Sequence, residues 1–253
     1  MSVLLVDIGN TRIKWARLVR GRLGRQRAAA HLEWSARDYR TTLFGKVTDV
    51  ERILVASVAG ARIDRRLAGA ARRATGVTPV FVKSVRRAGG VTTRYRDPWR
   101  LGVDRFVAVI GAHAMSGGRA ACVVDIGTAM TIDLVDGRGV HRGGTIVPGP
   151  ALMVSSLLRD TSGIGRRARG ARGGRALYAR NTLAAIEQGA LVAAGAMIDR
   201  AVADARRTLD APPRVLVTGG AAPSVRPLVR SAHRLVPDLV LRGLAVLATR
   251  TVP

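Results

Sequence analysis

The sequence predicts an α/β protein with two similar domains, because one short motif occurs twice and both halves of the chain alternate strands with helices. The segment VDIGNT at residues 6–11 recurs as VDIGTA at residues 124–129, and each copy follows a short apolar run. A repeat of this kind indicates an internal duplication. We therefore expect a domain over residues 1–118 and a second over residues 119–253, with a cleft between them. The Gly-rich stretch at residues 115–120 marks the boundary.

The first half contains patterns typical of strands and of amphipathic helices. Strands are expected at the short apolar runs of residues 3–9, 13–19, 53–60 and 79–83. The first two runs are separated by a tight turn and predict a hairpin. Helical spacing occurs over residues 62–75, which carry an Arg-rich solvent face, and over residues 102–115. One face of the second helix carries Val103, Phe106, Val107 and Ile110.

The second half begins in the same way. Residues 121–136 read as a strand, a turn and a strand, residues 140–149 continue with Gly at turn positions, and residues 214–220 form a third strand. The longest helical pattern covers residues 181–207, where Asn181 or Thr182 can cap the first turn. Its apolar face comprises Leu183, Ile186, Ala190, Ala194 and Met197. Residues 159–180 are rich in Gly and Arg without periodicity and predict a mobile loop.

Composition limits the class of protein. A hydrophobic fraction of 47% with only 4% aromatic residues predicts an aliphatic core. The single cysteine, Cys122, excludes an intramolecular disulfide and suits a reducing, cytoplasmic setting. No apolar run approaches the roughly 20 residues that a membrane helix needs. The net charge of +25 is carried almost entirely by Arg spread along the chain, with few aromatic residues to stack on bases, so nucleic-acid binding is not favoured.

The two repeated turns suit phosphate binding. Glycine allows the backbone to approach a ligand closely, and successive N–H groups can form a nest for phosphate oxygens. In the first turn, Asn10 and Thr11 add side-chain donors, Lys14 adds a positive charge, and Asp7 can reach a divalent cation through water. Residues 125–128 offer a similar turn. Either turn alone can also be an ordinary connection between strands, and the chain has no P-loop motif.

Four motifs in order resemble one superfamily. DxGNT at residues 7–11, GxDR at 102–105, DxGTAxT at 125–131 and TGG at 218–220 are similar to the acetate and sugar kinase, Hsp70 and actin superfamily. More narrowly, the chain resembles the type III pantothenate kinases, also called the Bvg accessory factor family, over essentially its whole length. Further matching segments are GGTIVPG (143–149), RNT (180–182) and DLVLRGL (238–244). The resemblance implies a duplicated actin-like, ribonuclease H-like kinase fold.

The resemblance also implies an activity. These kinases transfer the γ-phosphoryl group of ATP to pantothenate, giving 4'-phosphopantothenate in the first step of coenzyme A biosynthesis. They use Mg²⁺ with ATP and a monovalent cation, K⁺ or NH₄⁺, and they act as homodimers without inhibition by coenzyme A. The implied ATP-binding residues are Asp7, Ile8, Gly9, Asn10, Thr11, Arg12, Ile13, Lys14 and Thr128. Asp7 would hold Mg²⁺ through water, and Asp125 would bind the monovalent cation.

By the same resemblance, the substrate site includes the GVDR segment. The implied pantothenate-binding residues are Tyr95, Gly102, Val103, Asp104, Arg105 and, from the neighbouring subunit, Thr182. Asp104 is the implied catalytic base. Its place in the first turn of a predicted helix agrees, because the helix dipole stabilises a carboxylate there and an ionised Asp can accept a hydroxyl proton.

Other interpretations of these residues stay open. Asp104 can be an ordinary carboxylate at a helix start, Arg105 can form a surface ion pair, and Tyr95 can be a half-buried strand residue. Asp133 suits a metal or a structural role equally. Cys122 fits a core strand.

Other functions also stay open. The sequence TGGAAP lacks the acidic residue that the family often has after the glycines, so adenosine contacts near Gly219 and Gly220 stay open. A regulatory partner of a transcription factor and a kinase for another hydroxyl compound are the competing functions.

Overall fold

The computed structural model describes residues 2–45, 49–170, 172–174, 176–209 and 211–249. The chain divides into two compact units. The first contains the residues up to Gly118, the short segment Gly137–His141 and the end of the chain from Asp238, and the second contains Arg119–Asp136 and Arg142–Pro237. The first break follows Gly118, next to the expected domain boundary. The last helix belongs to the second expected domain by sequence but packs within the first unit.

The sheet of the first unit has the strand order β3-β2-β1-β5-β6, and β4 also pairs with β2. These strands are β1 (Ser2–Ile8), β2 (Arg12–Val19), β3 (Arg22–Leu23), β4 (Arg27–Ala30), β5 (Arg52–Ser57) and β6 (Val80–Phe81). β1 and β2 form the expected antiparallel hairpin, and β5 runs parallel to β1. Every residue of β1 is buried, which explains its continuous apolar run.

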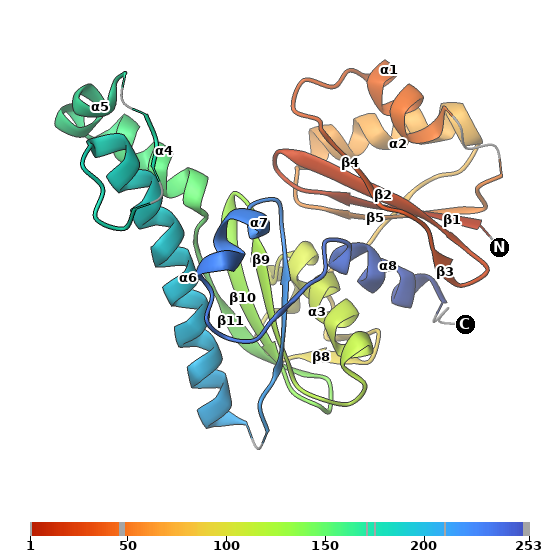
Figure 1. Ribbon diagram of the computed structural model, residues 1–253. Helices are drawn as coiled ribbons and strands as arrows, with labels where there is room; N and C mark the ends of the chain where they lie inside the picture. Colours follow the sequence, from red (N-terminus) through yellow and green to blue (C-terminus); the bar gives the residue numbers. More distant parts are fainter. Residues whose placement is uncertain (1, 46–48, 171, 175, 210, 250–253) are drawn as a thin grey trace. The chain divides into compact units, whose positions relative to one another are not determined.

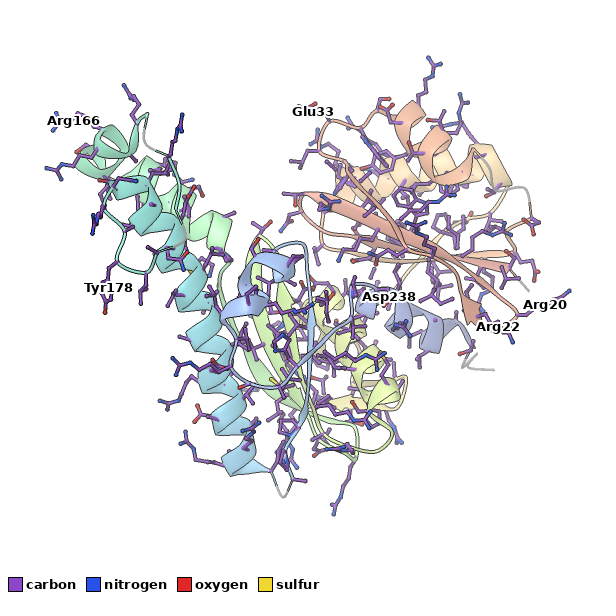
Figure 2. The ribbon with its side chains drawn as sticks, viewed as in Figure 1. Arg20, Arg22, Glu33, Arg166, Tyr178 and Asp238 are labelled. Carbon is purple, nitrogen blue, oxygen red and sulfur yellow. The ribbon has the colours of Figure 1, made fainter. Side chains whose placement is uncertain are left out.

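Helices cover both faces of this sheet (Figure 1). One face carries α1 (Ala36–Tyr39), η1 (Arg40–Phe44) and α2 (Ala61–Thr75), and the other carries α8 (Leu239–Thr249). The apolar residues of α2, Ile63 and Leu67, enter the core that β1 and β5 also form. Figure 2 shows Arg20 and Arg22 pointing outward from the β2–β3 hairpin, where both residues line an open hollow of about 660 Å³.

The remainder of the first unit supports helix α3. It comprises β7 (Arg87–Ala88), β8 (Val91–Thr93), η2 (Pro98–Arg100) and α3 (Val103–Ser116). Val140 and His141, at the start of β11 (Val140–Pro148), pair with β8. Helices α3 and α8 cross at glycines: a Cβ on Gly111 would meet the carbonyl oxygen of Leu239, and one on Gly243 would meet that of Val107. Side chains at these glycines would therefore separate the two helices.

The second unit is a sheet with a long helix packed against it. Its strands follow the order β13-β12-β9-β10-β11, with β9 (Ala121–Ile126), β10 (Ala129–Val135), β12 (Arg214–Thr218) and β13 (Arg234–Leu235). Figure 1 shows α6 (Thr182–Thr208) alongside this sheet and α4 (Pro150–Asp160) and α5 (Ser162–Ala168) near the start of α6. The unit is completed by α7 (Ala222–Val225) and η3 (Arg226–Leu228). Asn181 caps α6 as expected, since its side-chain oxygen accepts a 2.9 Å hydrogen bond from the Ala184 N–H.

The structure corrects three expectations. Residues 159–180 were expected to be a loop, but α4 extends to Asp160 and α5 covers Ser162–Ala168. Glycines in this segment obscure the helix, although Gly165 is needed because a Cβ there would press on the carbonyl oxygen of Leu158. Gly143 and Gly144 lie within strand β11 rather than in turns, and residues 79–83 supply only the two-residue strand β6.

Among the described residues, no helix combines the length and apolarity that crossing a membrane requires. Helix α6 is long, but polar residues occur in its first two turns, at Glu187 and Gln188, and again from Asp199 to its end.

Candidate active site

The first candidate site is the turn between β1 and β2. Ile8 pairs with Ile13, and the turn is closed by a 3.0 Å hydrogen bond from the Gly9 N–H to the carbonyl oxygen of Arg12. Asn10, Thr11 and Arg12 are exposed, whereas β1 beneath them is buried. The hairpin therefore presents its polar turn residues to solvent at the end of a rigid buried strand, as a phosphate-binding turn requires.

Asp7 and Lys14 face each other below this turn. They are paired in register across the two strands, and the Lys14 Nζ lies 3.8 Å from the Asp7 Oδ2. Asp7 is only 6% exposed. The oxygens of such a carboxylate are suited to a hard cation.

The second candidate turn, between β9 and β10, is one residue shorter than the first. Ile126 pairs with Met130, and the Gly127 N–H donates to the carbonyl oxygen of Ala129 at 3.0 Å. Thr128 is exposed. The duplicated motif therefore forms a similar hairpin in each unit, and the turn of the second copy is one residue shorter.

Two other glycines, Gly149 and Gly219, pack closely against the second turn. The Gly149 N–H donates a 2.9 Å hydrogen bond to the Thr128 carbonyl oxygen, and a Cβ on Gly149 would overlap the carbonyl oxygen of Gly127. Gly219 follows β12 with φ +99° and lies directly against Ile126. A Cβ on Gly219 would lie 2.5 Å from the Asp125 Oδ1. The segments that contain Gly127, Gly149 and Gly219 thus meet around the Asp125–Thr128 turn. This close approach is possible only because glycine has no side chain.

Helix α3 begins at the GVDR segment of the first unit. Gly102 precedes the helix, and its carbonyl oxygen accepts a 3.0 Å hydrogen bond from the Phe106 N–H. The Asp104 Oδ1 accepts a 2.8 Å hydrogen bond from the Arg105 N–H. A Cβ on Gly102 would lie 2.8 Å from the same oxygen. The missing side chain at Gly102 therefore leaves room for the carboxylate at the helix N-terminus, where the dipole stabilises it.

The structure brings Tyr95 to Arg105. An Arg105 Nη1 donates a 3.0 Å hydrogen bond to the Tyr95 hydroxyl oxygen, and the guanidinium carbon lies 5.8 Å from the centre of the Tyr95 ring. Arg105 is 6% exposed. A buried guanidinium held in this way can recognise a carboxylate.

Two residues that the sequence analysis missed support Tyr95. The His141 ring stacks on the Tyr95 ring at 5.9 Å with an interplanar angle of 16°, and its Nδ1 lies 3.2 Å from the Thr93 Oγ1. The Arg86 guanidinium donates to three carbonyl oxygens of the same loop, those of Thr93 (3.0 Å), Tyr95 (2.7 Å) and Arg96 (2.9 Å). Only the fold reveals these roles, because neither residue belongs to a motif.

Thr182 lies elsewhere, at the start of α6. It lines an apolar hollow of about 430 Å³ formed by α4, α5 and α6. The other residues lining the hollow are Met153, Leu157, Ile164, Ala185, Ile186, Gly189, Ala190 and Ala193. The exposed Tyr178 points away from this region into solvent (Figure 2).

The described part of the chain contains no group of three or more His, Cys, Asp or Glu side chains that could hold a metal by itself. Asp7 and Asp125 each offer one carboxylate. Such single carboxylates fit a cation whose remaining ligands come from phosphate oxygens, water or backbone carbonyl groups.

Two other candidate residues, Cys122 and Asp133, are buried in strands of the second unit. Cys122 lies in β9, where burial and then the charge of Asp133 raise the pKa of its thiol to about 12, so it is not a nucleophile at neutral pH. Asp133 is 1% exposed in β10, which favours the structural interpretation of this carboxylate.

Comparisons with known proteins give one consistent result. A family model for type III pantothenate kinase matches residues 3–204. A type III pantothenate kinase from Nitrosococcus oceani is 36% identical over 253 residues, covering 98% of this chain and 94% of the relative. Another from Herminiimonas arsenicoxydans is 38% identical over 257 residues, covering 99% of each protein.

A solved structure supports the fold. The ROK family glucokinase from Streptomyces griseus, in complex with glucose and AMPPNP, has a TM-score of 0.51 and 14% identity, covering 99% of this chain and 100% of the glucokinase. The actin-like kinase fold that the sequence predicts is therefore confirmed.

Proposed function

Because the chain belongs to the type III pantothenate kinase family, and so phosphorylates pantothenate with ATP in coenzyme A biosynthesis, we propose how its residues divide this work. The observation that carries the proposal is the Arg105–Tyr95 hydrogen bond of 3.0 Å beside the Asp104 carboxylate. The hydrogen bond joins an anion-binding guanidinium to a phenol, and the base candidate Asp104 is the neighbouring residue in the first turn of α3. Recognition of a hydroxy acid requires these three groups.

Pantothenate binds at the start of α3. Arg105 pairs with the pantothenate carboxylate, and Tyr95 orients the guanidinium and donates a hydrogen bond from its own hydroxyl to the substrate. Gly102 and Val103 contribute backbone groups. The support for this assignment is the burial of Arg105 and its fixed partner, because a charge held in a buried position has a specific use.

Asp104 is the general base. Its carboxylate accepts the proton of the pantothenate primary hydroxyl as the oxygen attacks the γ-phosphorus of ATP, and the bond from that phosphorus to the bridging oxygen of ADP breaks. In phosphoryl transfer, most of the acceleration comes from positioning and charge neutralisation. The dipole at the helix N-terminus favours the negative charge of the Asp104 carboxylate.

The two glycine turns bind phosphate oxygens. Asp7, Ile8, Gly9, Asn10, Thr11, Arg12, Ile13 and Lys14 form the first turn and its flanks, and Thr128 belongs to the second. Lys14 places a positive charge beside the first turn. Mg²⁺ bound with ATP would neutralise phosphate charge, with Asp7 as its protein partner through water. Asp125 would hold K⁺ or NH₄⁺. We infer that the protein acts in the cytoplasm, because the reaction consumes ATP.

The working form is a homodimer, whose second copy covers the apolar hollow of α4, α5 and α6. Its support is the set of small residues along α6 that line the hollow, including Ala185, Gly189 and Ala193, which permit close helix packing. Thr182 lines the same hollow, so a dimer formed there places this residue at a subunit boundary. Light scattering after gel filtration should give twice the chain mass of 26.8 kDa. Ala185→Glu should yield the monomer, whereas Ala203→Glu on the exposed side of α6 should not.

The primary experiment is a coupled phosphorylation assay with pantothenate, ATP and Mg²⁺, in potassium and again in sodium. Turnover in potassium, less in sodium and almost none for Asp104→Asn would support the base and the monovalent cation together. Arg100→Gln, which changes an exposed charge of the preceding turn, is the matched control and should retain wild-type rates. Full activity of Asp104→Asn would remove Asp104 from the role of base.

A further inference from the structure

His31 is a buried polar residue next to the first glycine turn that the reaction described above does not use. It follows strand β4, which pairs with β2 up to the contact of Ala30 with Arg12. The His31 N–H extends this pairing by donating to the Thr11 carbonyl oxygen at 3.3 Å. The ring is 1% exposed, whereas Glu33 in the same loop points into solvent (Figure 2). The His31 ring is thus buried beneath the β1–β2 turn.

Each ring nitrogen of His31 has a fixed partner. The Nε2 lies 2.8 Å from the Gly9 carbonyl oxygen, and the Nδ1 lies 2.9 Å from the Tyr39 hydroxyl. A carbonyl oxygen only accepts hydrogen bonds, so Nε2 carries the proton. In the neutral ring, Nδ1 then accepts a hydrogen bond from the Tyr39 hydroxyl. The two contacts together select one tautomer of the imidazole.

The Tyr39 hydroxyl is a stable donor for the hydrogen bond to Nδ1. Tyr39 is fully buried, and burial raises the pKa of its hydroxyl above the ordinary value, so the group stays protonated. Its ring packs edge-on against Trp34 at 5.1 Å and against His31 at 6.3 Å. The imidazole therefore has little freedom to rotate away from Gly9.

The contact with Gly9 fixes more than one carbonyl group. The Gly9 C=O and the Asn10 N–H belong to the same peptide unit, and in a trans peptide the two bonds point in opposite directions. None of the described peptide bonds is cis. Because the Gly9 oxygen is held inward by His31, the Asn10 N–H is directed outward, on the exposed side of the turn.

We propose that His31 is a positioning residue for ATP, which holds the Gly9–Asn10 peptide so that the Asn10 N–H faces a phosphate oxygen. The inference rests on the proposed phosphate-binding role of the first turn. His31 touches no nucleotide itself. Without the His31 side chain, the Gly9–Asn10 peptide can rotate. The phosphate then loses the Asn10 N–H as a donor that is already oriented before ATP binds.

Three variants test this role by their ATP affinity, measured by titration calorimetry with Mg²⁺ and ATP, and by the KM values for both substrates. His31→Leu should weaken ATP binding about tenfold, the loss of roughly one oriented hydrogen bond, and leave the KM for pantothenate unchanged. His31→Gln, which keeps an N–H donor, should recover much of that loss. Leu43→Ala, in the same core, should lower thermal stability without changing ATP affinity.

The outcomes separate this inference from the proposed site. Wild-type ATP affinity in folded His31→Leu, or equal weakening in Leu43→Ala, would overturn the positioning role. If His31→Leu does not fold, Tyr39→Phe decides, since it keeps both rings and should still weaken ATP binding measurably; unchanged affinity would overturn the inference. Lys14→Met reports on the turn itself. If Lys14→Met weakens ATP binding and His31→Leu does not, only the positioning role of His31 is rejected. If neither variant weakens ATP binding, the phosphate-binding role of the first turn is rejected.

Discussion

The Arg105 guanidinium donates a 3.0 Å hydrogen bond to the hydroxyl oxygen of Tyr95, ten residues earlier in the chain. The two residues belong to different elements, a loop after β8 and the first turn of α3. Their contact means that neither side chain can bind substrate independently of the other. His141, stacked on Tyr95, and Arg86, bonded to the backbone of the same loop, keep this pair in place.

Arg105→Lys should raise the KM for pantothenate by about one to two orders of magnitude, because an ammonium cannot make the two-pronged contact of a guanidinium with a carboxylate. Tyr95→Phe should have a smaller effect in the same direction. Initial rates at varied pantothenate and saturating ATP measure both effects. The KM for ATP should not change. An unchanged KM for pantothenate in Arg105→Lys would show that the carboxylate binds elsewhere.

Cys122 should not react with thiol reagents while the protein is folded. Burial, followed by the charge of Asp133, raises the pKa of the Cys122 thiol from 9.0 to about 12. The folded state thus keeps this proton up to higher pH than the unfolded state, and the stability linked to it is lost as pH rises from 9.0 towards about 12. Labelling with a chromogenic disulfide at neutral pH should be slow in the native protein and fast in denaturant. Rapid native labelling would contradict the burial of this strand.

Asp199 on α6 should stabilise the second unit in a pH-dependent way. Its carboxylate accepts the backbone N–H groups of Arg230 (3.1 Å) and Ser231 (2.8 Å). Burial alone would raise the pKa of Asp199, but these N–H groups outweigh burial and lower the pKa below its ordinary value. The stabilisation is therefore present above the unfolded pKa and is lost as pH falls through the lower folded pKa.

Asp199→Ala should cost about 1 kcal/mol near neutral pH, a value reduced by the partial exposure of the carboxylate. Denaturant unfolding of wild type and variant at neutral and at strongly acidic pH measures this. The difference between the two proteins should shrink in acid. A difference independent of pH would mean that packing, rather than the ionised carboxylate, links α6 to residues 230–231.

Strongly periodic segments predict most of the fold. The β1–β2 hairpin, α2 and the capped helix α6 follow from local patterns, since each buries one face against a neighbour. Helix α5 was missed because Gly163 and Gly165 resemble loop residues. The packing of α8 within the first unit depends on close approach at Gly111 and Gly243, a contact between distant segments that no local pattern contains.

The motifs predict part of the candidate site. They identify the turn residues and the GVDR segment, and the structure joins Tyr95 to Arg105 within one unit. They do not identify His31, His141, Arg86 or Gly149. Each of these acts on a turn or loop distant in sequence, through a ring, a guanidinium or a missing side chain. Such roles arise only when strand pairing brings the segments together.

Gly219→Ala should destabilise the second unit and disturb the Asp125 carboxylate. Gly219 has φ +99°, which residues with a side chain rarely adopt, and an added Cβ would overlap the backbone of Ile126 and lie 2.5 Å from the Asp125 Oδ1. Backbone strain and overpacking each cost about 1–3 kcal/mol, so the melting temperature should fall by roughly 5–10 °C.

Two measurements in potassium and in sodium separate the loss of stability from the effect on Asp125. By scanning calorimetry, the melting temperature of Gly219→Ala should fall in both salts. In the phosphorylation assay, the advantage of potassium over sodium should diminish, because the added Cβ displaces the Asp125 carboxylate. Gly69→Ala is the matched control. There the added Cβ would meet only the flexible end of Arg73, and replacing a glycine within α2 should stabilise the helix by about 0.5–1 kcal/mol. An unchanged melting temperature for Gly219→Ala would mean that the β12 turn can move away from β9, and that the close packing around Asp125 is not required.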